Sequence, residues 1–415
     1  MSSHAGMSSE RLARIDRYLK TAYVDTGKLP GTLAMVSRRG KIVHTSVQGL
    51  ADRERGKALK EDTIFRIYSM TKPITSVAFM MLVEEGLVAL DEPVHRHIPA
   101  WKDLGVFAGG TLGQFMTKPT SAPMRMVDLL RHTSGLTYGF QQRTNVDAAY
   151  RKLGIGHAQI GTDMPDPGLS LEAAIEALAK VPLEFSPGTA FNYSVSTDVL
   201  GYLVQKISGK PFADFLSERI FKPLGMTDTA FEVPEDKRSR FAACYALGKK
   251  GETVLQDDPE KSSYLKPPHF VSGGGGLVGT AADYMKFCQM MLAGGKAPGG
   301  TRLLGPKTIE LMAMNHLPGG RELMDMSVSL FTESGNAGVG FGLGLAPTIN
   351  VARSMVAGNV GSYFWGGAAS TTFWCDPKED LAVVFMTQFL PSAHYPIRRD
   401  LRTLVYGAIE EANGW

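Results

Sequence analysis

The sequence predicts an α+β fold in which one antiparallel sheet is shared by the two ends of the chain and covered by helices. Near one end, strand-like segments at residues 32–37 and 42–47 flank a short polar turn, the pattern of a β-hairpin. Near the other end, residues 369–374 and 381–389 repeat this pattern around a second polar turn. Because each hairpin lies beside a helical terminus, we expect both to join one sheet.

Amphipathic helices are predicted at both termini, at residues 9–27 and 397–409, where apolar residues recur every three or four positions. The middle of the chain is rich in glycine, proline and helical segments and is interpreted as an insertion. We therefore predict a discontinuous sheet domain of residues 1–100 and 331–415 and a mainly helical insertion of residues 101–330. The active site is expected in the cleft between them.

Composition excludes several classes of protein. Of the 415 residues, 44% are apolar and 20% are charged, as in ordinary globular proteins. The net charge of +3 comes without a basic run, so no nucleic acid partner is expected. Neither an apolar signal segment nor a stretch of ~18 apolar residues is present, so we expect a cytoplasmic protein without a membrane partner. Three dispersed cysteines are expected to be reduced and buried, and oligomeric state is not indicated.

The strongest chemical signal is Ser69-Met70-Thr71-Lys72 at the start of a helical pattern that ends near Gly86. Residues three apart lie on the same helical face, so a lysine amine can act as base for the serine hydroxyl. A helix N-terminus also supplies N–H groups that stabilise an oxyanion. This arrangement is typical of serine enzymes that transfer acyl groups without a histidine. The alternative is that Ser69 only caps the helix.

A second copy of the spacing, Ser263-Tyr264-Leu265-Lys266, is interpreted as a chance match. It runs directly into Pro267 and Pro268, which do not allow a regular helix to begin there. The copy at Ser69 has the helical context that the chemistry needs.

Tyr193 is the predicted proton shuttle, because it follows a turn at residues 186–189 and precedes a helical pattern. A tyrosine beside a lysine ammonium has a lowered pKa and can act as a base. A buried core tyrosine is the alternative.

Trp365-Gly366-Gly367 is predicted to begin an edge strand, where glycines let a substrate approach the backbone. The backbone N–H of Ala368 can then join that of Ser69 in an oxyanion hole. The alternative is a glycine bulge beside a packed tryptophan. Tyr138, Phe140 and Trp365 are proposed as pocket walls, with Gly366 and Gly367 as further substrate-binding residues.

Other catalytic schemes find less support. The Gly-x-Ser-x-Gly turn of α/β-hydrolases is absent, so His132 is interpreted as structural and not as a triad base. His95 and His97 lack a third ligand at suitable spacing, so neither a metal nor a cofactor is expected.

The ordered set Ser69-x-x-Lys72, Tyr193-Ser194-Val195 and Trp365-Gly366-Gly367 resembles the serine β-lactamase-like superfamily. Residues 129–136, 273–280 and 340–344 agree with it, and the resemblance covers about residues 10–410. The chain is similar to family VIII carboxylesterases, relatives of class C β-lactamases and DD-peptidases. The resemblance implies a β-lactamase-like fold, with Ser69 as nucleophile, Lys72 and Tyr193 as coupled acid/base groups, and the N–H groups of Ser69 and Ala368 as oxyanion hole.

Two departures from the superfamily pattern bear on the substrate. Trp365 stands where β-lactamases and DD-peptidases carry a lysine that binds a carboxylate, and Val195 replaces an asparagine. Both remove polar recognition, so a small, neutral carboxylic ester is the expected substrate. The alternatives are an acyltransferase with the same residues, a β-lactamase or D-amino-acid peptidase, and a non-catalytic binding protein on this scaffold.

Overall fold

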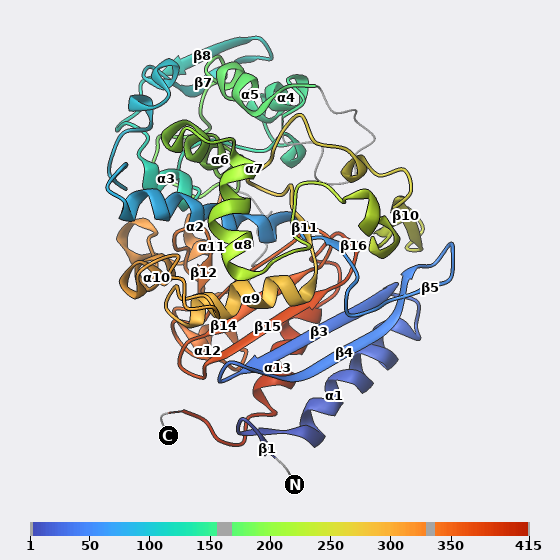
Figure 1. Ribbon diagram of the computed structural model, residues 1–415. Coiled ribbons are helices and arrows are strands. Elements are labelled where there is room, and N and C mark those ends of the chain that lie inside the picture. Colours follow the sequence, from blue (N-terminus) through green and yellow to red (C-terminus); the bar gives the residue numbers. More distant parts are fainter. Residues whose placement is uncertain (1–2, 156–167, 329–336, 414–415) are drawn as a thin grey trace.

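A seven-stranded antiparallel sheet forms the base of the molecule in the computed structural model, which describes residues 3–155, 168–328 and 337–413 (Figure 1). In spatial order its strands are β12 (Ala346–Pro347), β13 (Tyr363–Gly366), β14 (Thr372–Asp376), β15 (Leu381–Met386), β3 (Gly31–Arg38), β4 (Lys41–Asp52) and β5 (Lys57–Ala58). The two ends of the chain meet where β15 pairs with β3, with Val383 opposite Val36. The shared antiparallel sheet is therefore confirmed.

Helices cover both faces of this sheet, because side chains along each strand alternate between the two faces. On one face, Val36 and Val383 pack with α1 (Ser9–Leu19), which continues as a π-helical turn over Lys20–Val24, and with α13 (Ile397–Tyr406). On the other face, Met35 and Val384 belong to the main core with α9 (Ala281–Leu292) (Figure 1). The predicted terminal helices are thus present, side by side on one face.

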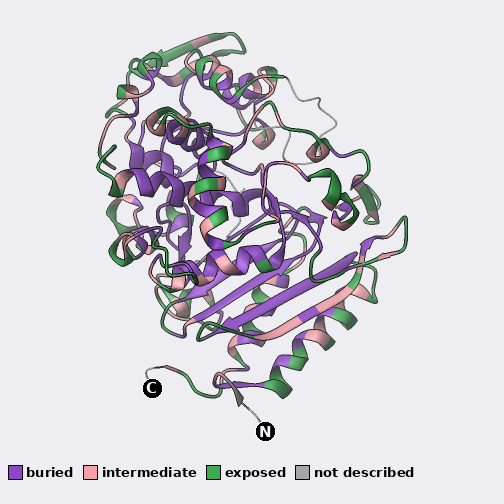
Figure 2. Ribbon diagram, viewed as in Figure 1, coloured by how far each residue is buried: buried purple, intermediate pink, exposed green. Residues whose placement is uncertain are grey.

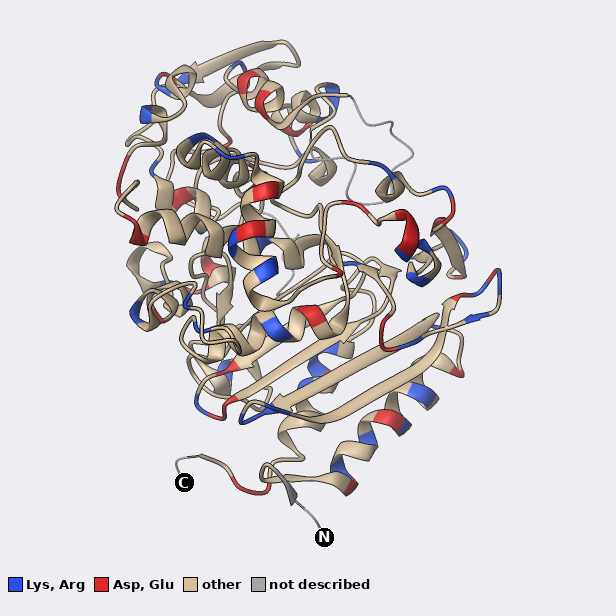
Figure 3. Ribbon diagram, viewed as in Figure 1, with Lys and Arg blue, Asp and Glu red and all other residues tan. Residues whose placement is uncertain are grey.

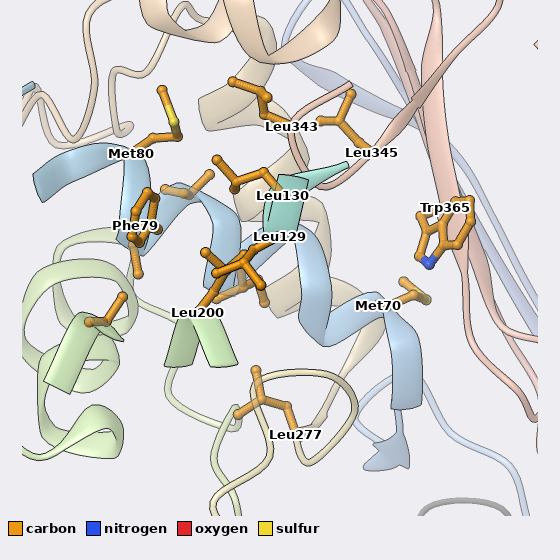
Figure 4. Packing of buried hydrophobic residues seen from close by; sticks show 14 of the residues in the cluster. Met70, Phe79, Met80, Leu129, Leu130, Leu200, Leu277, Leu343, Leu345 and Trp365 are labelled. Carbon is orange, nitrogen blue, oxygen red and sulfur yellow. The ribbon is translucent and has the colours of Figure 1, made fainter. Parts of the chain in front are cut away.

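The centre of the helical part is α2 (Thr71–Glu84), which begins directly after Ser69. A helix on the surface of a core buries one face, but every residue of α2 from Thr71 to Leu82 is buried. The reason is its position: α6 (Ser196–Ser208) and α3 (Met126–Leu130) surround it together with the sheet. Figure 2 shows this burial, and Figure 4 shows Leu129, Leu200 and Leu343 around α2.

Shorter elements complete the molecule. The remaining α-helices are α4 (Asn145–Lys152), α5 (Leu171–Leu178), α7 (Phe212–Leu216), α8 (Lys222–Leu224), α10 (Pro306–Ala313), α11 (Leu323–Met326) and α12 (Val351–Ser354). The small sheets are β1 (Ser3–His4) with β2 (Met7–Ser8), β6 (Phe65–Arg66) with β11 (Val278–Gly279), β7 (Val106–Thr111) with β8 (Gln114–Lys118), and β9 (Cys244–Leu247) between β10 (Thr253–Asp257) and β16 (Phe389–Leu390).

The α+β class is confirmed, whereas the division into domains at residues 100/101 and 330/331 stays a prediction. All three cysteines are free and buried, as expected. No helix within the described ranges combines the length and apolar character of a membrane span. Figure 3 shows basic and acidic residues interspersed over the ribbon, and the absence of a nucleic acid partner stays a prediction.

Candidate active site

Ser69 lies in a tight turn that leads into the central helix. The turn is a 3-10 helix over Tyr68–Met70, and Tyr68 has a φ of 44°, a left-handed conformation that is strained for a residue with a side chain. Tyr68 is held there by packing against Ala368 and Ala369. The turn presents the Ser69 hydroxyl at the mouth of α2, as the sequence predicted.

Lys72 points its ammonium at three oxygen atoms within the protein. The side chain is 1% exposed, and Nζ donates to Ser69 Oγ at 3.3 Å, Tyr138 OH at 3.1 Å and the Gly274 carbonyl at 2.6 Å. An ammonium has three N–H bonds, so each has an acceptor. The predicted pairing of Ser69 with Lys72 is therefore present in the geometry.

Tyr193 lies beside the same ammonium. Lys72 Nζ is 4.4 Å from the centre of the Tyr193 ring, and Trp365 Nε1 donates to Tyr193 OH at 3.3 Å. Gln141 holds the Tyr193 backbone through a hydrogen bond from Nε2 to its carbonyl. Three predicted residues, Lys72, Tyr193 and Trp365, thus meet in space although more than a hundred positions separate each from the next.

Tyr138 was predicted to form a pocket wall, but the structure buries it beside Lys72. It is 1% exposed, its hydroxyl accepts from Lys72, and its ring stacks on Phe140 at 4.7 Å between centres. Burial raises the pKa of Tyr138 well above the usual value, so the hydroxyl stays protonated. Phe140 is only half-buried, and its role as a pocket wall stays a prediction.

Asp198 belongs to the site and was missed by the sequence analysis. Its Oδ1 accepts hydrogen bonds from the Gly274 backbone N–H at 2.9 Å and from Ser272 Oγ. Burial raises the pKa of this carboxyl group, while Ser272 and Lys72 lower it. A Cβ at Gly274 would lie 2.7 Å from Asp198 Oδ2, so glycine is needed there. The sequence signal nearest to this contact was the glycine run at residues 273–276.

Trp365 and Gly366 end strand β13, which corrects the prediction that they begin an edge strand. β13 is second in the sheet, but β12 pairs only with Tyr363 and Phe364. Within the described ranges, no strand therefore covers the outer side of Trp365 and Gly366. Trp365 is fully buried, because its ring packs on Tyr193 and on Phe341.

The turn after β13 brings Ala368 next to the Ser69 turn. A Cβ at Gly367 would lie 2.6 Å from the Ile67 carbonyl, so the absence of a side chain allows this close approach. The Gly367 N–H donates to the Thr371 carbonyl at 2.9 Å and closes the turn. No described residue accepts a hydrogen bond from the Ala368 N–H. That N–H is therefore available to an incoming oxygen atom.

His132 packs beneath Tyr193, with 4.9 Å between the ring centres. Its Nδ1 lies 3.1 Å from Ser194 Oγ, which is hydrogen-bonded to Ser196. Burial and, secondarily, the Lys72 charge lower the pKa of His132 well below its usual value. Its surroundings agree with a structural role.

The other histidine and serine–lysine patterns lie elsewhere. His97 contacts Glu92, with 3.0 Å between Nε2 and Oε1. The second Ser-x-x-Lys spacing lies in a short 3-10 turn, and both Ser263 and Lys266 are exposed. This exposed turn agrees with the interpretation of the second spacing as a chance match.

Comparison with known proteins identifies the family. Residues 16–407 match the Beta-lactamase family. The chain belongs to the beta-lactamase family. Esterase EstB of Burkholderia gladioli is 31% identical over 390 residues, which cover 90% of each chain. Protein Rv1367c of Mycobacterium tuberculosis is 36% identical over 372 residues, which cover 88% of each.

Solved structures agree with this beta-lactamase family fold. EstCE1, described as a hydrolase with promiscuous acyltransferase activity, has a TM-score of 0.76 and 25% identity, covering 96% of this chain and 98% of its own. Simvastatin Synthase (LovD) from Aspergillus terreus has a TM-score of 0.79 and 25% identity, covering 97% and 98%. Together with the esterase relative, family membership makes this chain a serine hydrolase.

In this beta-lactamase family member, replacing Tyr138 by phenylalanine is expected to lower kcat about tenfold. Hydrogen bonds to charged groups contribute about 1.5–3 kcal/mol, and Tyr138→Phe removes one from Lys72 while keeping the stack on Phe140. KM should change little. Steady-state kinetics test this, with Tyr202→Phe as control, because Tyr202 accepts from Lys206 in another tyrosine–lysine pair. An unchanged kcat in Tyr138→Phe would contradict a role for this hydroxyl.

Proposed function

We propose that this protein is a serine carboxylesterase of the family VIII type, which hydrolyses neutral, short-chain esters through an acyl-enzyme. The observation that carries the proposal is the 3.3 Å contact between Ser69 Oγ and Lys72 Nζ, beside Tyr193 and Trp365. A nucleophile with an adjacent base fits acyl transfer, and the apolar tryptophan fits a neutral substrate.

In the proposed reaction, Lys72 and Tyr193 act as a coupled acid/base pair that takes the single proton of Ser69 as its Oγ attacks the ester carbonyl, and Tyr193 then carries that proton. The backbone N–H groups of Ser69 and Ala368 stabilise the oxyanion of the tetrahedral intermediate. Tyr193 protonates the leaving alkoxide and then activates the water that releases the acid. The tight packing of the Ala368 turn against Tyr68 supports this, because it holds the second donor beside the nucleophile.

The preference for neutral esters is proposed from Trp365 and Val195. Trp365 contributes an indole ring where the superfamily carries a lysine, and its N–H is directed to Tyr193. Val195, at the position of the usual asparagine, is buried and apolar. The name of the relative Esterase EstB supports an ester substrate.

Acyl transfer to an alcohol is the second candidate function. It is favoured by relatives named as acyltransferases, such as Acyltransferase calJ of Penicillium decumbens, and by the description of EstCE1. The same residues serve both reactions, and only the acceptor that attacks the acyl-enzyme differs. Product analysis with an added primary alcohol separates them, because a transferase forms a new ester in preference to the free acid.

The substrate class is tested with short p-nitrophenyl esters and a chromogenic cephalosporin. We expect turnover of acetate and butyrate esters, with kcat/KM for the cephalosporin lower by at least about a hundredfold, a difference of about 2.7 kcal/mol in transition-state binding. Dominant cephalosporin cleavage would overturn the esterase proposal in favour of a β-lactamase. Turnover of neither substrate would contradict it as well.

A further inference from the structure

We propose that Arg398, in the first turn of the C-terminal helix, is a positioning residue for the oxyanion hole. It acts on the peptide bond between Gly367 and Ala368, whose N–H is one of the two proposed donors. This inference rests on the proposed function, because an oxyanion forms only if Ser69 attacks a carbonyl group.

The guanidinium of Arg398 binds both ends of the turn that carries Ala368. Its Nη2 donates to the Gly367 carbonyl at 3.0 Å and to the Thr371 carbonyl at 2.9 Å. The Gly367 carbonyl also accepts from the Ser370 N–H at 3.1 Å inside the turn. One side chain of α13 therefore joins the two ends of the turn, while Phe389 holds its middle through a hydrogen bond to the Ala369 carbonyl and one from Ser370 Oγ.

The carbonyl of Gly367 and the N–H of Ala368 belong to one peptide unit. A peptide unit is planar and trans, so its C=O and N–H point in opposite directions. Arg398 holds the carbonyl and thereby fixes the direction of the N–H. A charged donor on the carbonyl also polarises the unit, which strengthens the hydrogen bond that the N–H gives to an oxyanion.

Gly366 provides the space that this guanidinium occupies. A Cβ at Gly366 would lie 2.4 Å from Arg398 Nη2 and 2.5 Å from its Cζ. Because strand residues alternate in direction, that Cβ would point to the face opposite the Trp365 side chain. The first glycine of Trp365-Gly366-Gly367 thus makes room for Arg398, in addition to its predicted role in binding substrate.

The two other arginines of α13 have different surroundings. Arg399 is exposed and pairs with Asp400, with 3.3 Å between Nη2 and Oδ1. Arg402 lies over the rings of Phe364 and Trp374. Arg399 therefore offers a matched control on the same helix.

The test compares Arg398→Ala with Arg399→Ala in the full-length protein, using p-nitrophenyl butyrate. Removing an oxyanion donor costs about 10²–10³ in kcat, and loss of its positioning should cost about 10–100-fold. We expect this loss in kcat for Arg398→Ala, with KM within about twofold and Arg399→Ala unchanged. Binding of a boronic acid, which mimics the tetrahedral intermediate, should weaken by the same factor as kcat/KM.

Two further variants separate positioning from general stability. Arg398→Lys, which keeps the charge but has no planar fork, should recover only part of the lost kcat. Gly366→Ala displaces the guanidinium without removing it, so it should lower kcat like Arg398→Ala. The double variant should then be no worse than either single variant, because both remove the same interaction.

The inference would be overturned if Arg398→Ala kept the wild-type kcat and the wild-type affinity for the boronic acid. The proposed function would still stand in that case if ester turnover depends on Ser69. A parallel loss in Arg399→Ala would overturn it too, since it would indicate a general effect on α13. If Arg398→Ala does not fold, Gly366→Ala and Arg398→Lys test the inference through kcat, KM and boronic acid affinity. Wild-type kinetics in both of these variants would overturn it.

Discussion

Replacing Ser69 by alanine is expected to lower kcat/KM for p-nitrophenyl esters by about 10⁴-fold or more, the loss seen when a serine hydrolase is deprived of its nucleophile. The hydroxyl is the only atom removed, and it contacts Lys72 at 3.3 Å. Ser69 is buried in a turn fixed by its neighbours, so the fold should be retained. Circular dichroism and thermal unfolding check the fold, and steady-state kinetics check the activity.

The matched control for Ser69→Ala is Ser263→Ala, in the second Ser-x-x-Lys spacing of the chain. This exposed variant should keep wild-type kinetics. A p-nitrophenyl phosphonate should add one covalent adduct to the wild type, mapped by mass spectrometry to Ser69, and none to Ser69→Ala. Ester hydrolysis retained by purified Ser69→Ala would exclude Ser69 as the nucleophile.

Replacing Lys72 by methionine is expected to lower kcat about 10³-fold, within the usual contribution of about 10²–10⁴ from a general base. Methionine has similar length and no N–H bond, so Tyr138 OH and the Gly274 carbonyl lose their donor. A buried polar group left without its partner costs about 1–3 kcal/mol, so the free energy of unfolding should fall too. Lys266→Met, at the exposed second spacing, should change neither quantity.

The stability loss in Lys72→Met should depend on pH through Asp198. Burial raises the pKa of this carboxyl group in the folded protein, and Lys72 partly offsets that shift. A raised carboxyl pKa means that folding favours the protonated form, so stability falls as pH rises from the unfolded pKa through the folded pKa. Without Lys72 the pKa of Asp198 in the folded protein is raised further, so the fall in stability with rising pH is larger. The difference in Tm from wild type should therefore grow as pH rises above the pKa of the unfolded carboxyl group, and a difference independent of pH would contradict this coupling.

The sequence predicted Ser69 and Lys72 because their relation is local: a helical repeat places residues three apart on one face. Tyr193 was predicted from its place between a turn and a helical pattern, and Ala368 from the glycines before it, and the resemblance implied both. The structure brings Tyr193 to Lys72 and Ala368 to the Ser69 turn. The sequence analysis missed Asp198 because its partners, Ser272 and Gly274, lie in a loop more than seventy positions away along the chain. No periodic pattern records such a contact.

The sheet and α2 show the same limit of prediction from local sequence patterns. The hairpins of the sheet were predicted from strand-like segments that flank a polar turn, which is a local property of the sequence. The burial of α2 on all sides depends on α3, α6 and the sheet together, so the residues of α2 do not reveal it. Whether a strand covers the outer side of Trp365 depends on the length of β12, which pairs only with Tyr363 and Phe364.

The pairing of β3 with β15 has a consequence for biosynthesis. During translation the strand that covers one edge of β3 is made more than 300 residues after β3 itself. At the usual ~5–20 residues per second, β3 waits roughly 20–70 s for its partner. The nascent chain carries Ser69 and Lys72 during that interval without the Ala368 turn or α13. Activity is therefore not expected before the Ala368 turn and α13 have been made, and the unpaired edge of β3 exposes the growing chain to chaperones until then.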